Sequence, residues 1–244
     1  MLDSFTVIFA ISALASLIWL GWAPSNDALQ AGSPTRLMVA GTAALFGGLM
    51  GARSIYVVLH WGYFQSNLLD IPMLWKGGLS GFGGLIGAAA GAWIYARGAK
   101  LQFWTLADAL ARPAAAMSTA IWAGCWMTGW AYGTPVDWGI LQADIFGRQT
   151  ARWPAALLAA LGSAGWALIL PWLEKRWSMR INGQIACLTL GWLGVMILTV
   201  SLLRADPTIL YAGIRQETWA AAIAIMLAII AWIYRLRTAK EVHP

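Results

Sequence analysis

The residues of this sequence that could do chemistry are a few charged side chains within or beside long apolar stretches. Arg53 lies inside one stretch, in the segment Gly47–Tyr56, while Arg204 and Asp206 follow another. A charge at membrane depth costs about 2.5–3.5 kcal/mol or more, so it should face a polar cavity or a partner. We interpret Arg53 either as a ligand of an anionic lipid headgroup or as a structural, snorkelling arginine. Arg204 with Asp206 is either an interface anchor or part of a headgroup site.

Other familiar reactive sites find no support in the sequence. Cys125 and Cys187 both lie in apolar runs, which favours small buried hydrophobic residues over nucleophiles. His60 and His243 are the only histidines and lie far apart, so we expect no metal site, no haem and no other cofactor. The absence of a GxxxxGK loop and of a GxSxG turn argues against a nucleotide-driven transporter and a soluble-type hydrolase.

A further pair of charges lies at the start of an apolar run. Asp108 and Arg112 are four residues apart, the spacing that places two side chains on one face of a helix. An aspartate near a helix N-terminus also complements the helix dipole. We therefore expect a structural pair at the membrane interface.

The elements that position these charges must be membrane helices. The chain is 60% hydrophobic and only 11% charged, whereas soluble domains carry about 25% charged residues. Its 17 tryptophans suit the headgroup zone, because an indole combines an apolar body with one N–H donor. The net charge of +6 fits loops that face anionic lipid. No basic stripe with interleaved aromatic residues occurs, so no nucleic-acid partner is expected. The fold class expected is therefore an all-α integral membrane protein.

Seven apolar runs are each close to the roughly 20 residues that a spanning helix needs. They lie near 4–23, 37–59, 78–96, 106–130, 153–173, 183–203 and 218–234. The first run lacks a basic flank and a clear cleavage site, so it is not a standard signal peptide. We expect a single membrane domain over residues 1–244, with the polar stretch 131–152 as an outer loop or lid.

The basic residues of the loops predict the orientation. With the N-terminus outside, nine face the cytoplasm: Arg36, Arg97, Lys100, Lys175, Arg176, Arg180, Arg235, Arg237 and Lys240. Five lie on the opposite side: Lys76, Arg148, Arg152, Arg204 and Arg215. The positive-inside rule therefore favours the N-out, C-in arrangement.

Several motifs together resemble the bacterial prolipoprotein diacylglyceryl transferase family over roughly residues 37–236. Gly47–Tyr56 resembles its GGxxGARxGY segment, and Lys76–Gly87 its GGLSxHGGLIG motif. Further matches are Leu59–Trp61, Leu106–Ala111, Gly129–Gly133, Gly183 with Gln184, and Arg204–Asp206. The motif glycines are Gly77, Gly78, Gly83, Gly84, Gly87 and Gly133. Glycines at 83, 87 and 91 also let another helix backbone approach closely.

The resemblance implies a reaction whose side chains are replaced here. In the family, a cysteine thiol attacks the glycerol carbon of phosphatidylglycerol and glycerol phosphate leaves. A histidine can accept the thiol proton, and arginines can stabilise the phosphate. That histidine is Phe82 here, the two arginines are Trp122 and Ile197, a glutamate is Ser201 and an asparagine is Cys125. Loss of a general base commonly costs about 10²–10⁴ in rate.

Two hypotheses about function follow. The first is a degenerate homologue in the bacterial inner membrane, a multi-pass lipid-binding or structural subunit of a membrane assembly. The second is an active transferase with a displaced catalytic set: His60, Tyr56 and Tyr132, with Arg53 and Arg204 holding the headgroup. The resemblance implies phosphatidylglycerol as a partner, with prolipoprotein signal segments or other membrane subunits as further candidates.

Overall fold

The computed structural model describes residues 4–22, 33–144, 146–177 and 181–242. The chain divides into two compact units. Residues 17–109 form the small unit, whereas residues 1–16 and 110–244 form the large unit. The boundaries fall inside helices α1 (Ser4–Trp22) and α6 (Phe103–Thr128).

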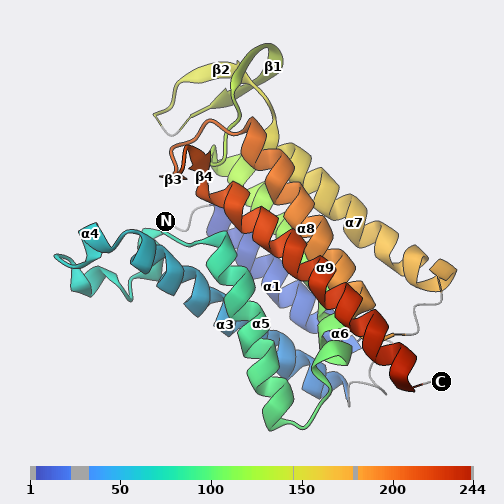
Figure 1. Cartoon of the computed structure of the whole chain (residues 1–244). Helices are drawn as coiled ribbons and strands as arrows, with labels where there is room; N and C mark the ends of the chain where they lie inside the picture. Colours follow the sequence, from blue (N-terminus) through green and yellow to red (C-terminus); the bar gives the residue numbers. More distant parts are fainter. Residues whose placement is uncertain (1–3, 23–32, 145, 178–180, 243–244) are drawn as a thin grey trace. The chain divides into compact units, whose positions relative to one another are not determined.

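The small unit is built around two long helices joined by an irregular loop (Figure 1). The two long helices are α3 (Pro34–Leu59) and α5 (Gly81–Gly98). The loop between them contains α4 (Trp61–Phe64) and the 3-10 turns η1 (Leu68–Asp70) and η2 (Leu74–Lys76). Both long helices begin at serine caps, whose hydroxyl groups accept otherwise unpaired backbone N–H donors. Ser33 accepts from Arg36, and Ser80 accepts from Gly83. The caps fix where the loop meets each helix.

Glycines bring α3 and α5 into backbone contact. A Cβ atom on Gly87 would lie 2.1 Å from the Gly47 carbonyl oxygen, and one on Gly83 would lie 2.4 Å from that of Gly51. A Cβ atom on Gly91 would likewise lie 2.2 Å from the Ala43 carbonyl oxygen. The close helix approach expected from the glycine spacing is therefore present, and α3 is its partner. Small residues allow such packing where no hydrophobic effect drives helices together.

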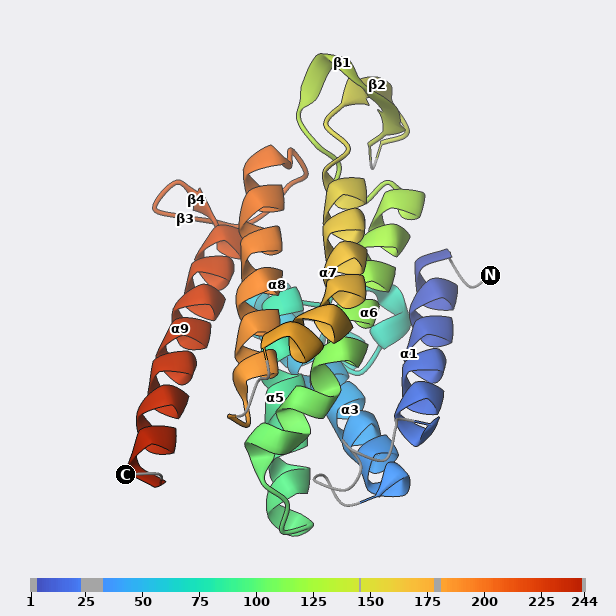
Figure 2. The same cartoon turned by 90° about the vertical axis from the view of Figure 1, so that its right-hand side faces the viewer.

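The large unit combines helices with two small hairpins (Figure 2). Besides parts of α1 and α6, it holds β1 (Pro135–Ala143), β2 (Gln149–Arg152), α7 (Ala155–Trp177), α8 (Gln184–Leu203), β3 (Leu210–Tyr211), β4 (Ile214–Arg215) and α9 (Gln216–Val242). Trp166 of α7 stacks on Trp192 of α8, with 5.1 Å between the ring centroids. The Trp166 indole N–H donates to the Thr189 hydroxyl, and the Trp192 indole N–H donates to the Gly162 carbonyl, so both donors have an acceptor.

The α6–α7 pair is joined by an ion pair. Arg112 donates to the Glu174 carboxylate, and both side chains are largely buried. The spacing of Asp108 and Arg112 did not suggest this partner, because Glu174 is distant in sequence. The ion pair therefore links α6 to α7, instead of stabilising a single helix.

The stretch 131–152 adds a small sheet to the mainly helical fold that the sequence predicts. It forms the antiparallel hairpin β1–β2 instead of an irregular loop, and Figure 2 shows it beyond the ends of α6 and α7. Gln142 pairs with Thr150 and Leu141 with Ala151, while a bulge separates Pro135 from Ile140. The β3–β4 hairpin, between α8 and α9, is a second small sheet.

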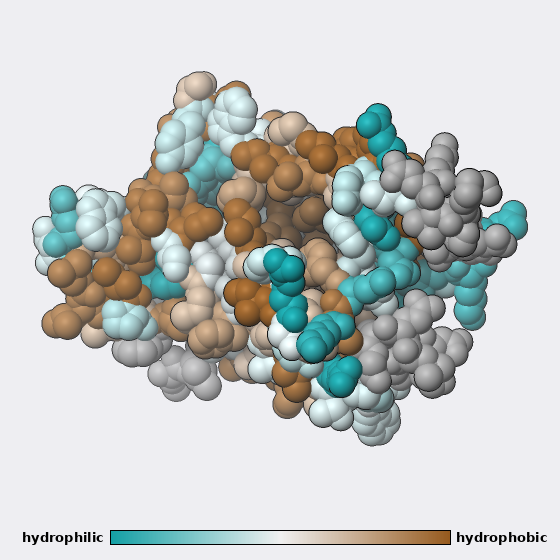
Figure 3. Space-filling model, turned by 60° about the horizontal axis from the view of Figure 1, so that its bottom comes forward, coloured by the Kyte–Doolittle hydropathy of each residue, from teal (hydrophilic) through white to brown (hydrophobic). Residues whose placement is uncertain are grey.

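All seven apolar runs lie on helices, as their composition predicts. Of the helices that the structure describes, five are long and apolar enough to cross a membrane: Ser4–Trp22, Pro34–Leu59, Ala155–Arg176, Gln184–Leu203 and Gln216–Thr238. The runs 78–96 and 106–130 lie on α5 and α6. Large apolar side chains reach the surface widely, as Figure 3 shows, with Leu168 80% exposed. Such a surface suits lipid, so this is a mainly helical membrane protein.

Candidate functional site

Arg53 organises the loop between α3 and α5 in the small unit. Its Nε donates to the Ile71 carbonyl at 2.8 Å. Nη1 donates to Gly77 and Gly78, and Nη2 donates to Asp70 and Met73, always to backbone carbonyls. The residue is only 6% exposed. Because hydrogen bonds to a charged donor are worth about 1.5–3 kcal/mol each, this arginine holds the loop in one conformation.

Two glycines let the loop close over the guanidinium group. Gly77 and Gly78 have φ of 78° and 76°, a region that side chains disfavour. A Cβ atom on Gly78 would also lie 2.4 Å from the Tyr56 ring. The motif glycines at 77 and 78 are therefore required by backbone shape, which lets both carbonyls turn toward Arg53.

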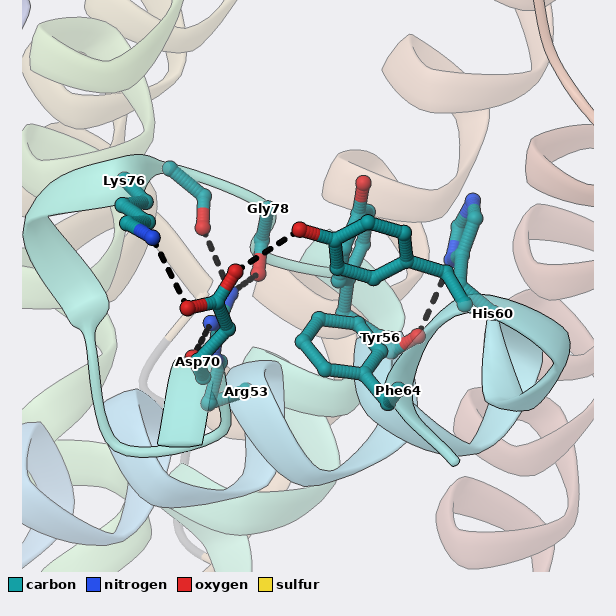
Figure 4. A pocket seen from close by; sticks show the side chains of 9 residues that line it. Arg53, Tyr56, His60, Phe64, Asp70, Lys76 and Gly78 are labelled. Atoms are coloured by element: carbon teal, nitrogen blue, oxygen red, sulfur yellow. Dashed lines mark hydrogen bonds and ion pairs between the residues drawn. The ribbon is translucent and has the colours of Figure 1, made fainter. Parts of the chain in front are cut away.

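A cavity of about 440 Å³ opens beside this arginine (Figure 4). It is lined by Arg53, Tyr56, His60, Tyr63, Phe64, Asp70, Lys76, Gly77 and Gly78. The Arg53 guanidinium carbon lies 5.2 Å from the Phe64 ring centroid and 5.9 Å from that of Tyr56. The cavity therefore has aromatic walls around a buried cation, and it gathers five of the candidate residues from the sequence.

One side of the cavity is a hydrogen-bonded triad. Asp70 accepts from the Tyr63 hydroxyl at 2.7 Å and from the Lys76 ammonium at 2.8 Å. The bond from Lys76, and then that from Tyr63, holds the pKa of Asp70 below its usual range. The same bond raises the pKa of Lys76. At neutral pH the triad therefore contains a carboxylate and an ammonium.

The other side of the cavity carries His60 in a defined tautomer. Its Nδ1 lies 2.9 Å from the Tyr56 carbonyl, which can only accept, so Nδ1 carries the proton. In the neutral form of the ring, this tautomer leaves a lone pair on Nε2. The Tyr56 ring stacks on His60 with 4.0 Å between centroids and fixes its plane.

A second polar cluster lies at the ends of α8 and α9 in the large unit. Arg204 donates to Asp206 through both Nε and Nη2. Arg215 also donates to Asp206 and lies 3.5 Å from Glu217. The Thr208 hydroxyl completes the cluster by donating to Glu217. Two arginines thus face two carboxylates, and the charges balance.

The same cluster meets the chain that leads into the β1–β2 hairpin. Gly133 pairs with Arg204, and the Ala205 N–H donates to the Tyr132 carbonyl at 2.9 Å. Tyr132 is buried, and its ring lies 4.7 Å from the guanidinium carbon of Arg152. The structure therefore brings Tyr132, Gly133 and Arg204 together. It defines no relation between these residues and the Arg53 cavity.

Sequence reasoning missed the buried polar residues of the β1–β2 hairpin. Arg152 is 7% exposed and donates to the Gly133 carbonyl and to Asp144. Gln142 is equally buried, and its side-chain amide has no partner among the described residues. The signal available was the two-residue spacing of Gln142 and Asp144, which places them on one face of a strand.

The residues at the altered family positions are buried or half-buried in their helices. Phe82 lies half-buried in the first turn of α5. Trp122 packs on a core cluster around Ala155 and Val200. Ser201 is 2% exposed and shares a hydrogen bond of 2.8 Å with Thr218. Ile197 is half-buried on α8. Within the described ranges, no group of three His, Cys, Asp or Glu residues is placed to hold a metal ion.

The chain is similar to known transferases over most of its length. The family model described as prolipoprotein diacylglyceryl transferase matches residues 2–234. The phosphatidylglycerol–prolipoprotein diacylglyceryl transferase of Geobacillus kaustophilus is 33% identical, over 88% of this chain and 82% of that protein. The protein of that name from Streptococcus pneumoniae is 30% identical, over 78% and 74%. With motifs, membrane helices and a whole-length match in agreement, the chain belongs to the prolipoprotein diacylglyceryl transferase family.

Proposed function

We propose that this protein is a bacterial inner-membrane member of the family that binds phosphatidylglycerol but does not transfer diacylglyceryl groups at a useful rate. It acts as a lipid-binding or structural subunit of a membrane assembly. Its seven apolar helices span the bilayer with the N-terminus outside and the C-terminus in the cytoplasm. The positive-inside distribution of the loops supports this topology.

The observation that carries the proposal is the set of substitutions at the family's reactive positions. Phe82 cannot take a proton from a thiol. Trp122 and Ile197 cannot neutralise a phosphate, and Ser201 replaces a carboxylate. The changes fall in three different helices, α5, α6 and α8. Loss of the base alone costs about 10²–10⁴ in rate, and the missing cations weaken the transition state further, although such losses do not add.

The partners of the remaining arginines support the same view. Arg53 is held by five backbone carbonyls, and Arg204 is paired with Asp206. A phosphate would have to displace the carbonyls from Arg53, whose five N–H groups are all occupied, and the charge of Arg204 is already balanced by Asp206. Both arginines remain candidates for lipid binding, because the charge of Arg53 attracts an anion without a direct bond, and the bonds of Arg204 to Asp206 involve only its Nε and Nη2. They are poor replacements for catalytic cations.

Complementation tests the loss of transfer. The full chain is expressed in a bacterium depleted of its own transferase, and a lipobox substrate is examined by mass spectrometry. We expect no rescue and no modified substrate, whereas an active family member restores both. Phe82→His alone should also fail, because Trp122 and Ile197 still occupy the arginine positions. Rescue by the unmodified chain would overturn the proposal.

One observation favours the second hypothesis, a transferase with a displaced catalytic set. With Nδ1–H donating to the Tyr56 carbonyl, the neutral His60 ring carries a lone pair on Nε2, and a histidine of this kind can accept a thiol proton. If the unmodified chain rescues growth, His60→Ala should abolish rescue. Tyr56→Phe and Tyr132→Phe then test whether a hydroxyl takes part. Rescue that survives all three changes would exclude this catalytic set.

A further inference from the structure

We propose that the Arg53 cavity binds an anionic, hydroxylated lipid headgroup, with Lys76 holding the phosphate and His60 accepting from a headgroup hydroxyl. The inference deepens the lipid-binding part of the proposed function and rests on it. It assigns the phosphate contact to Lys76 instead of Arg53. Figure 4 shows Lys76 and His60 on opposite sides of the cavity, with Asp70 and aromatic rings between them.

Arg53 shapes the site and supplies charge without touching the ligand. All three of its nitrogen atoms donate to backbone carbonyls, and the residue is 6% exposed. These carbonyls carry only partial charges, so no carboxylate bonds the guanidinium directly. Its positive potential therefore reaches the cavity, although its donors are occupied.

The charges that line the cavity leave an excess of one positive charge. Among the residues that line the cavity, Arg53 and Lys76 are cations and Asp70 is the one carboxylate. The Lys76 ammonium has three donors, of which one bonds Asp70, and its side chain is 52% exposed. The ammonium can therefore donate to a phosphate oxygen while it keeps its bond to Asp70.

His60 adds a requirement for a hydrogen-bond donor on the ligand. Because Nδ1–H donates to the Tyr56 carbonyl, Nε2 of the neutral imidazole can only accept. The stacked Tyr56 ring holds this acceptor in place. A hydroxyl group on the headgroup satisfies Nε2, whereas a bare phosphate oxygen repels it. The site thus selects an anion that also carries a hydroxyl.

A lipid headgroup is the occupant that suits the surroundings. The loop that forms the cavity joins α3 and α5, and α3 is long and apolar enough to cross a membrane. Tyr56, Tyr63 and Phe64 give the cavity apolar walls, which accommodate the carbon atoms next to a phosphodiester. Phosphatidylglycerol provides one negative charge and two hydroxyl groups. Glycerol 3-phosphate shares this chemistry without the acyl chains, so the test includes both.

The test measures lipid retained by the full-length protein in native mass spectrometry, with phosphatidylglycerol, phosphatidic acid and phosphatidylcholine compared. We expect phosphatidylglycerol to bind best. Lys76→Gln should weaken its binding about tenfold, the usual scale for a charge-assisted hydrogen bond. Lys100→Gln removes the same charge from an exposed loop that does not line the cavity, so it should change nothing. Asp70→Asn should strengthen binding, because it removes the cavity's carboxylate.

His60→Phe tests the hydroxyl contact while keeping a ring that stacks on Tyr56. It should reduce the preference for phosphatidylglycerol over phosphatidic acid several-fold, and the preference for anionic over zwitterionic lipid should remain. Glycerol 3-phosphate at millimolar concentration should compete weakly. Complete displacement by it would assign the site to a free phosphate ester and overturn the lipid assignment.

The outcomes separate this inference from the proposed function. If wild-type protein retains phosphatidylglycerol and Lys76→Gln and His60→Phe retain it equally well, the cavity is not the site and the inference fails alone. If wild-type protein shows no preference for phosphatidylglycerol, lipid binding itself fails. The transfer question is decided separately, by complementation. Thermal unfolding of each variant shows whether a loss reflects misfolding.

Discussion

Replacing Gly87 by alanine should force α3 and α5 apart, whereas the same change at Gly84 should be tolerated. A Cβ atom on Gly87 would lie 2.1 Å from the Gly47 carbonyl oxygen and 2.9 Å from the Gly51 Cα. Carbon–oxygen contacts ordinarily need about 3.3 Å, so one helix must move by roughly 1.2 Å. A Cβ atom on Gly84 would lie 3.7 Å from the Ala52 Cβ, an ordinary contact.

The matched pair isolates the packing cost. Alanine favours the helix over glycine by about 0.5–1 kcal/mol at either position, so this gain cancels between the two variants. Overpacking typically costs about 1–3 kcal/mol. Gly87→Ala should therefore be less stable than Gly84→Ala by about 1–3 kcal/mol. Unfolding in mixed detergent micelles, followed by circular dichroism, measures the difference. Equal stability of the two variants would refute the backbone contact between α3 and α5.

Three further predictions concern the loop and the topology. Arg53→Leu should leave five carbonyls without their donor, so the loop after α4 should become sensitive to limited proteolysis; unchanged resistance would contradict its organising role. The pKa of Asp70 is lowered in the folded protein, so the stability that its carboxylate contributes is complete above the ordinary pKa of 3.8 and is lost as pH falls through the folded pKa. Acid should therefore release Lys76 and speed hydrogen exchange in the loop. Cysteines placed at Thr150 and Thr238 should be labelled from opposite sides of the membrane, and labelling of both from outside would exclude the proposed orientation.

The helices and the glycine contact could be predicted because their signals are periodic and local. Apolar runs of the right length locate the seven long helices of the described residues. The spacing of Gly83 and Gly87 predicts a helix that approaches closely, although it does not name α3 as that helix. Composition therefore predicts the elements, while their pairing needs the three-dimensional structure.

The arrangement around Arg53 could not be predicted in the same way. The sequence identifies an arginine at membrane depth that needs partners, and it suggests a lipid. The partners found are backbone carbonyls, which every residue carries, so no residue type marks them in the sequence. The hairpin at 135–152 was missed because two of its polar side chains, Gln142 and Arg152, are buried. Polar residues in a connecting segment usually indicate an exposed loop.

Because the contacts of Arg53 are made to main-chain oxygen atoms, they are indifferent to the side chains of the residues that supply them. Ile71 and Met73 could change to many other types without loss of a bond, whereas Gly77 and Gly78 are restricted by their positive φ angles. The backbone conformation of the loop is thus fixed, whereas the side chains on its surface can vary. Evolution could alter what this surface recognises, one side chain at a time, while the fold of the loop stays the same.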